Sequence, residues 1–131
     1  MKALDWSRYP NFEPHELVCK HCKQEGIRPE MMELLQNVRV DVNLPFFISS
    51  GYRCKNHPIE HEKDKPGEHT LGLAVDVLCY GKKALELIFH AQSWGVKRIG
   101  IHQKGIPGGR YVHLGIADRF SLEYPAAIWT Y

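Results

Sequence analysis

The sequence predicts an α+β fold with a small, mainly antiparallel sheet and flanking helices. Three observations support this prediction: two segments with helical spacing of apolar residues, four short segments of strand character, and one long polar loop. Their order along the chain is helix, strand, loop, strand, helix and strand pair, which indicates an α+β arrangement. With 131 residues, 44% of them hydrophobic, and no repeat or linker, the chain is expected to form one domain over 1–131.

The first helix is predicted from a proline start signal and a regular apolar face. Residues before it are broken by prolines and are expected to be irregular. Pro29 suits the first position of a helix, where its missing N–H costs nothing. Apolar residues then recur on one helical face, at Met31, Leu34, Leu35, Val38 and Val42. Pro45 is expected to end the helix, and 46–49 (FFIS) reads as a short buried strand.

The second half begins with a polar loop over 50–69, and loops of this length are usually functional or disordered. Strand character follows at 73–79 (LAVDVLC). A second amphipathic helix, closed by Gly95, is marked by Ala84, Leu87, Ile88 and Ala91. Residues 96–102 and 110–116 read as two further strands joined by a turn.

Charge and hydropathy exclude several classes of function. A net charge of +2 is too small to indicate nucleic acid or an anionic membrane as a partner. No apolar run matches a secretory signal or a bilayer span, so the chain is expected to be cytoplasmic as translated and a monomer without membrane insertion. Action outside the cytoplasm would then require lysis, a virion or another route. In that compartment cysteines are expected to be thiols or metal ligands.

Asp76 is unexpected inside a strand of core residues, because a buried carboxylate is unfavourable unless it is paired or bound to metal. His69 lies at the end of the preceding loop, and His113 lies in the last predicted strand. If the two strands are neighbours, the three side chains converge. Two imidazoles and one carboxylate form a known ligand set for catalytic zinc. A satisfied core aspartate with two unrelated histidines is the alternative.

A family resemblance favours the metal interpretation. The run HTLGLAVD (69–76), preceded by SGYR (50–53) and followed by VH (112–113), resembles the zinc D-Ala-D-Ala carboxypeptidases of peptidase family M15, in particular the short phage-type branch. The likeness extends to FEPHELVCKHC (12–22) and IWTY (128–131). It implies the fold shared with the Hedgehog signalling domain, and Zn²⁺ bound by His69, Asp76 and His113. It also implies that Arg53 binds a substrate carboxylate, which suits a planar guanidinium.

The chain departs from the family pattern at several positions. Gly67 replaces the serine two residues before the first zinc histidine, and Pro58 replaces an asparagine after SGYR. Arg110 stands where several members carry an acidic general base, and Gly115 stands where another acid is often found. Peptide hydrolysis needs a group that moves a proton. His102, in the strand beside His113, and Glu68, next to His69, are the candidate catalytic residues, although no family motif matches either.

The sequence therefore predicts a zinc metallopeptidase that cleaves peptidoglycan stem or cross-bridge peptides, as a carboxypeptidase or an endolysin-type endopeptidase of phage or prophage origin. One alternative is a non-catalytic zinc module of the same fold that binds a peptide or wall fragment. Another is a structural or assembly protein in which zinc only stabilises the fold.

Cysteines and C-terminal aromatic residues form two further patterns. Cys19 and Cys22 have the spacing of half a structural zinc site. The missing ligands could come from Cys54, Cys79, His21, His15 or His57; two reduced thiols are an equal alternative, and a redox pair has no βαβ context. The aromatic residues near the end either line a cleft or cap the core, and core packing is preferred for Tyr124, Trp129 and Tyr131.

Overall fold

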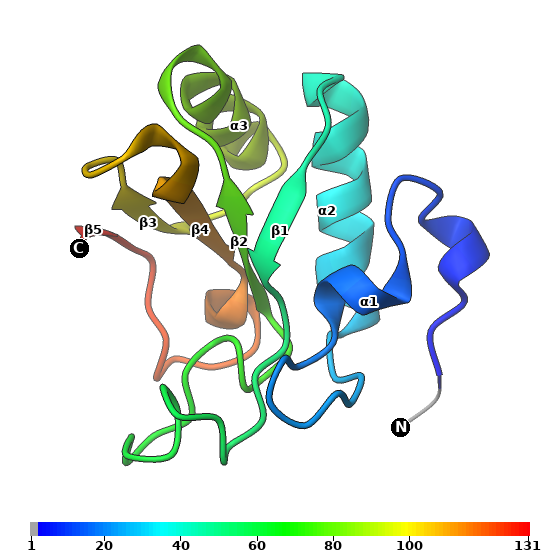
Figure 1. Cartoon of the computed structure of the whole chain (residues 1–131), viewed down its shortest axis with the longest axis vertical. Helices are drawn as coiled ribbons and strands as arrows, with labels where there is room; N and C mark the ends of the chain where they lie inside the picture. The colour runs from blue at the N-terminus through cyan, green and yellow to red at the C-terminus, as the bar shows by residue number, and fades with distance from the viewer. Residues whose placement is uncertain (1–2) are drawn as a thin grey trace.

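A computed structural model describes residues 3–131 and confirms the α+β class, with a sheet that is mostly antiparallel (Figure 1). Within these residues the sheet has five strands in the order β1-β2-β4-β3-β5. Their bounds are β1 (Phe47–Ser50), β2 (Ala74–Leu78), β3 (Arg98–His102), β4 (Tyr111–Gly115) and β5 (Ala127–Thr130). The α-helices are α1 (Pro14–Leu17), α2 (Pro29–Val42) and α3 (Gly81–Ser93), and short 3₁₀ helices lie at η1 (Trp6–Arg8), η2 (Pro107–Gly109) and η3 (Ala117–Arg119).

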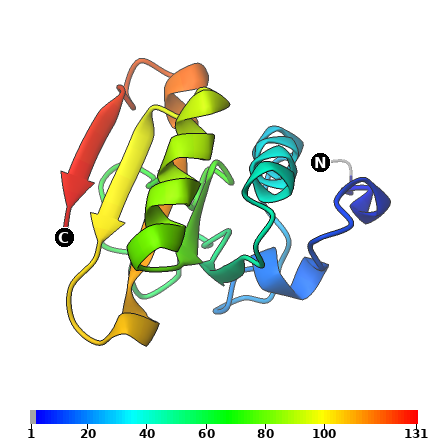
Figure 2. The same cartoon turned by 90° about the horizontal axis from the view of Figure 1, so that it is seen from above.

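The two long helices form one layer of the core. They pack against each other, and α3 also packs against β4 (Figures 1 and 2). Helix α2 begins at Pro29, as predicted, and all five residues of its predicted apolar face are buried. It ends before Pro45, because Asn43 takes the left-handed conformation (φ 54°) that closes a helix. None of the helices within residues 3–131 is long and apolar enough to cross a membrane.

The pairing of β2 with β4 sets the geometry of the functional face. Both neighbours of β4 run antiparallel to it, and Asp76 lies directly opposite His113. Because side chains alternate along a strand, these two residues point to one face. The residues on either side of them along each strand point to the other face and are fully buried in the core: Val75, Val77, Val112 and Leu114. The sheet therefore separates an apolar core from a polar face.

Besides the 3₁₀ helices, one strand and one α-helix of the described residues were not predicted from the sequence. Strand β5 runs parallel to β3 at the edge of the sheet, and α1 is a single turn in the segment expected to be irregular. Both are four residues long, and three of the four β5 residues are exposed. Such short pieces show no periodicity that identifies them. The loop over 51–73 contains only turns, close to the prediction for 50–69, and lies below the sheet in Figure 1.

Candidate metal centre

Three predicted ligands meet at the polar face of the sheet. Asp76 comes from β2, His113 from β4, and His69 from the turn that leads into β2. His69 Nε2 lies 3.3 Å from Asp76 Oδ1, and His113 Nδ1 lies 3.2 Å from the same oxygen. All three residues are only 5% exposed. The group has the composition and proximity of a metal site.

Hydrogen bonds on the far side of each ring determine which nitrogens are free. His69 Nδ1 lies 2.7 Å from the carbonyl oxygen of Gly51, which can only accept, so Nδ1 carries the proton. His113 Nε2 lies 2.8 Å from Glu68 Oε1 and donates to it. Each ring thus turns its other nitrogen, His69 Nε2 or His113 Nδ1, toward Asp76 Oδ1. When neither of these nitrogens carries a proton, three acceptors face one another, and this donor set fits a bound metal.

The charges at the site are held by this network. Burial alone would raise the pKa of Asp76, but the adjacent His113 and His69 rings hold the pKa of this carboxyl well below its usual range. Burial alone would lower the pKa of His113, but Asp76 and Glu68 raise it above its ordinary value. Asp76 is thus a carboxylate at neutral pH, ready to bind a cation. A proton on His113 Nδ1 would occupy the position beside Asp76 Oδ1 that a metal ion requires.

We expect the metal to bind more tightly as pH rises. The raised pKa of His113 stabilises the metal-free fold fully below the ordinary pKa of about 6.5, and this contribution is lost as pH rises through the raised value. Metal should therefore be held above that raised pKa and released as pH falls through it. NMR spectra of the histidine rings, recorded with and without zinc from about pH 5 to about pH 8, measure this. Zinc-induced shifts of His113 that are equal at both ends of that range would contradict it.

Glu68 supports His113 from behind the metal site. Its Oε1 accepts from His113 Nε2 and pairs with Arg98 Nε at 3.0 Å, while Oε2 accepts from the Ala117 N–H at 3.1 Å. A Cβ at Gly115 would lie 2.1 Å from Oε2, so only glycine leaves room for this carboxylate. Glu68 thus lies on the side of His113 opposite the nitrogen that faces Asp76. These contacts favour a role for Glu68 in orienting His113. The general-base role of Glu68 remains a prediction.

Arg53 lies beside the three ligands and holds the other oxygen of Asp76. Its Nη2 is 3.3 Å from Asp76 Oδ2, its Nη1 is 3.2 Å from Glu60 Oε2, and its Nε donates to Ser50 Oγ. Glu60, which sequence reasoning missed, is 5% exposed and also pairs with Lys63. Arg53 therefore orients a predicted ligand and faces the cleft at the same time. Its role in binding substrate remains a prediction.

A cleft of about 570 Å³ opens over the three ligands. Its cationic lining comes from Arg53, Lys63, Lys65 and Arg98, and its aromatic lining from Tyr111, Tyr124, Trp129 and Tyr131. The preference for core packing was wrong for Trp129 and Tyr131, which β5 and the residue after it place along the cleft. The Trp129 ring lies 5.0 Å from that of His113, over Gly100. Tyr124 is buried, at 6% exposed, and also borders the cleft.

His102, the other candidate base, is not among the residues that line the cleft. It lies on β3 opposite Tyr111, and the two rings stack with centroids 4.8 Å apart. Tyr131 packs on its edge at 5.8 Å. Its Nδ1 is buried and meets no hydrogen-bond partner within residues 3–131. The ring of Tyr111, on which His102 stacks, lines the cleft. The catalytic role of His102 remains a prediction.

The cysteines lie apart from these ligands. Cys19, Cys22 and Cys54 have sulfur atoms within 4.8 Å of one another, and all four cysteines are free thiols. Cys79 follows β2 and is buried, where desolvation raises the pKa of its thiol to about 11. Within residues 3–131 the structure therefore holds two separate clusters with the composition of a metal site.

Comparison with known proteins gives one family. A family model described as Peptidase M15 matches residues 10–114, which is more than half of the chain. The matched range contains Arg53, His69, Asp76 and His113, together with Cys19, Cys22 and Cys54. A search of curated proteins found no match to the chain.

Proposed function

The chain belongs to the peptidase M15 family, a family of metallopeptidases, and from this premise we propose that it is a zinc-dependent peptidase acting on bacterial cell-wall peptidoglycan. Residues 1–131 would act as one zinc peptidase domain. The observation that carries the proposal is the convergence of His69 Nε2, His113 Nδ1 and Asp76 Oδ1 at the floor of the cleft. Two imidazoles and a carboxylate are ligands that suit zinc in a hydrolytic site.

The proposed chemistry divides between the metal and the side chains around it. A zinc ion bound by these ligands would supply the Lewis acid that peptide hydrolysis requires. Arg53, Lys63 and Lys65 bring positive charge to the cleft and would bind the carboxylates of a stem peptide. Trp129 and Tyr131 form an aromatic wall against which the peptide backbone can pack. His102 and Glu68 are the candidates for moving the proton.

Turnover of defined wall peptides tests this proposal. The zinc-loaded protein is incubated with a peptide ending in D-Ala-D-Ala and, separately, with purified peptidoglycan, and the products are identified by mass spectrometry. Release of D-alanine indicates a carboxypeptidase, and new amino termini within the wall indicate an endopeptidase. Retention of full activity by both His102→Ala and Glu68→Gln would remove these two residues as the base. A metal-loaded protein that cleaves neither substrate would overturn the proposed function.

Arg53→Lys is expected to weaken substrate binding while the metal stays bound. Lysine keeps the positive charge that the buried Glu60 and Asp76 require but loses the two-pronged contact with a carboxylate. A loss of about 1.5 kcal/mol in a charged hydrogen bond corresponds to a roughly tenfold rise in KM. Steady-state kinetics with metal analysis measure both effects, and Arg8→Lys, at an exposed ion pair, is the control. An unchanged KM would contradict substrate binding by Arg53.

A non-catalytic binding module of the same fold is the second candidate. It is favoured by Arg110 and Gly115, which stand where the sequence resemblance implies acids, and by the contacts of Arg53 with two carboxylates of its own chain. Such a module would bind wall fragments with the metal present and leave them intact. Binding without turnover, measured by calorimetry and mass spectrometry on the same samples, would support this alternative.

A further inference from the structure

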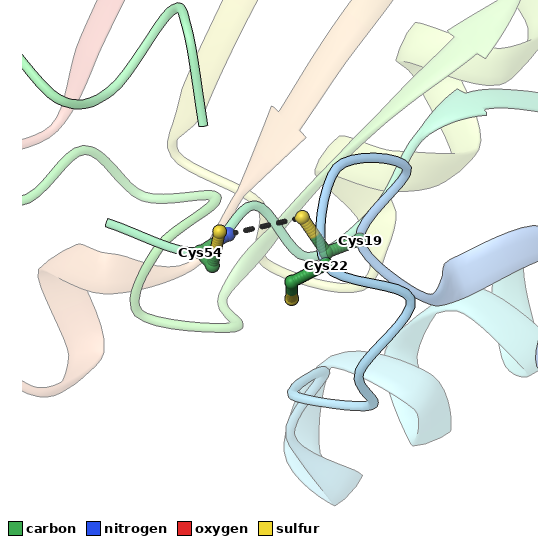
Figure 3. Close-up of side chains that lie close together, drawn as sticks. All are labelled: Cys19, Cys22 and Cys54. Atoms are coloured by element: carbon green, nitrogen blue, oxygen red, sulfur yellow. Dashed lines mark hydrogen bonds between the residues drawn. The ribbon is translucent and has the colours of Figure 1, made fainter. Parts of the chain in front are cut away.

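Three thiols lie close together outside the cleft. Cys19 and Cys22 lie on the N-terminal loop after α1, and Cys54 lies on the long loop directly after Arg53 (Figure 3). Their three sulfur atoms lie within 4.8 Å of one another. Cys19 is fully buried, while Cys22 and Cys54 are partly exposed, so the cluster opens toward solvent. Segments far apart in sequence thus bring three soft ligands to one point.

The backbone around Cys19 is arranged to receive negative charge. The N–H of Cys54 donates to Cys19 Sγ at 3.3 Å, the contact drawn as a dashed line in Figure 3. Backbone N–H groups of Cys22 and His21 are directed at the same sulfur. Peptide N–H groups directed at a sulfur favour a thiolate, which is the form that binds metal.

A tight turn holds the two N-terminal cysteines together. Lys23 N–H donates to the Cys19 carbonyl at 2.8 Å, and Cys19 N–H donates to the Gln24 carbonyl at 3.0 Å. Lys23 itself has φ 63°, a conformation that non-glycine residues seldom adopt. The turn returns the chain so that the sulfur of Cys22 lies near that of Cys19. The strained residue therefore lies in the turn that brings two of the three sulfur atoms together.

A histidine nitrogen lies beside this cluster. His21 Nδ1 is 3.4 Å from Cys54 Sγ, and the His57 ring centroid lies 6.1 Å from that of His21. His57 Nδ1 already accepts a hydrogen bond from the N–H of Ile59. The nitrogen nearest to the sulfur atoms and available to a metal is therefore that of His21. Three thiolates and one imidazole form a common ligand set for a closed, tetrahedral zinc site. A disulfide would use two of the sulfurs and leave the third without a role.

We propose that Cys19, Cys22 and Cys54, with His21 as the fourth ligand, bind a structural zinc ion that is separate from the cleft. The zinc links the N-terminal segment to the loop that carries Arg53, where Tyr52 N–H already donates to the Leu17 carbonyl at 3.0 Å. Because that loop contains only turns up to His69, a metal at Cys54 fixes the side of the cleft that has no helix or strand to hold it.

Zinc content of matched variants tests this site. The full chain, purified with zinc and without chelator, should contain about two zinc ions, and Cys54→Ala or Cys22→Ala should contain about one. Asp76→Ala should also contain about one, lost from the other cluster. Cys79→Ala is the control, because Cys79 is a buried thiol outside both clusters, and it should keep about two. With cobalt(II) in place of zinc, thiolate-to-metal charge-transfer absorption should persist in Asp76→Ala and be absent from Cys54→Ala.

A measurement on the unaltered chain covers the case in which a cysteine variant does not fold. A thiol-specific organomercurial should release about one zinc per chain, detected with a chromogenic chelator. Zinc content that is equal in the wild type and in folded Cys54→Ala would overturn the proposal. So would release of no zinc by the organomercurial, or a disulfide among Cys19, Cys22 and Cys54 found by peptide mapping without reductant.

Discussion

Replacing Asp76 with alanine is expected to remove the cleft metal and all peptidase activity together. The carboxylate is the only negatively charged member of the ligand group, and its Oδ1 lies within 3.3 Å of both imidazole nitrogens. Without it two neutral imidazoles remain, a set that holds zinc poorly. The substitution also leaves Arg53 without one of its two carboxylate partners. Breaking a buried ion pair lowers the free energy of unfolding by on the order of 3–5 kcal/mol.

Two controls separate loss of the ligand from loss of the fold. Asp76→Asn keeps the shape of the side chain and the contact with Arg53 but removes the charge, so it should fold and still bind metal weakly. Asp64→Ala alters an exposed aspartate of the long loop and should match the wild type. Metal analysis, circular dichroism and peptide turnover are measured on the same preparations. A folded Asp76→Ala protein that keeps a histidine-bound metal would contradict the assignment of Asp76 as a ligand.

Much of the fold follows from local patterns in the sequence. Pro29 and the apolar face from Met31 to Val42 predicted α2, because the start signal and the helical period agree. Strands β2 and β4 were predicted within two residues at each end, because each is a short run of mostly buried residues bounded by a loop or turn. Strand β5 was missed because it is a short edge strand that pairs in parallel with β3, and neither property leaves a periodic signal. Its side chains could be assigned to the cleft only from the tertiary structure.

The candidate site shows the same division. His69, Asp76 and His113 were brought together by reasoning from strand alternation, and the Asp76–His113 register is what makes them meet. The contacts behind them could not be predicted from spacing. Glu60 meets Arg53 only because the long loop folds back, and Arg98 reaches Glu68 from β3. Nor does any sequence pattern relate Glu68 to Gly115, although the first occupies the space beside the second.

This relation between Glu68 and Gly115 bears on the departure from the family pattern. The resemblance implies that relatives often carry an acid at the position of Gly115, two residues after His113. Here the carboxylate of Glu68 enters from the neighbouring loop and fills that place, accepting from His113 Nε2 at 2.8 Å. An acid at 115 would clash with it, since even a Cβ would lie 2.1 Å from Glu68 Oε2. In this chain the carboxylate that contacts His113 therefore comes from residue 68.

Glu68→Ala should therefore lower cleft-metal affinity by about 10- to 100-fold, the usual effect of removing a carboxylate that orients a metal-binding histidine. Glu68→Gln, which keeps an oxygen acceptor for His113 without the charge, should lose less. Gly115→Asp alone should be destabilised by the clash, yet in the Glu68→Ala background it should restore most of the affinity. That non-additive recovery, read by chelator competition with thermal unfolding as a check on folding, distinguishes positioning of His113 from general damage. A double variant that binds metal no better than Glu68→Ala, or a folded Glu68→Ala with wild-type affinity, would show that Glu68 does not orient His113.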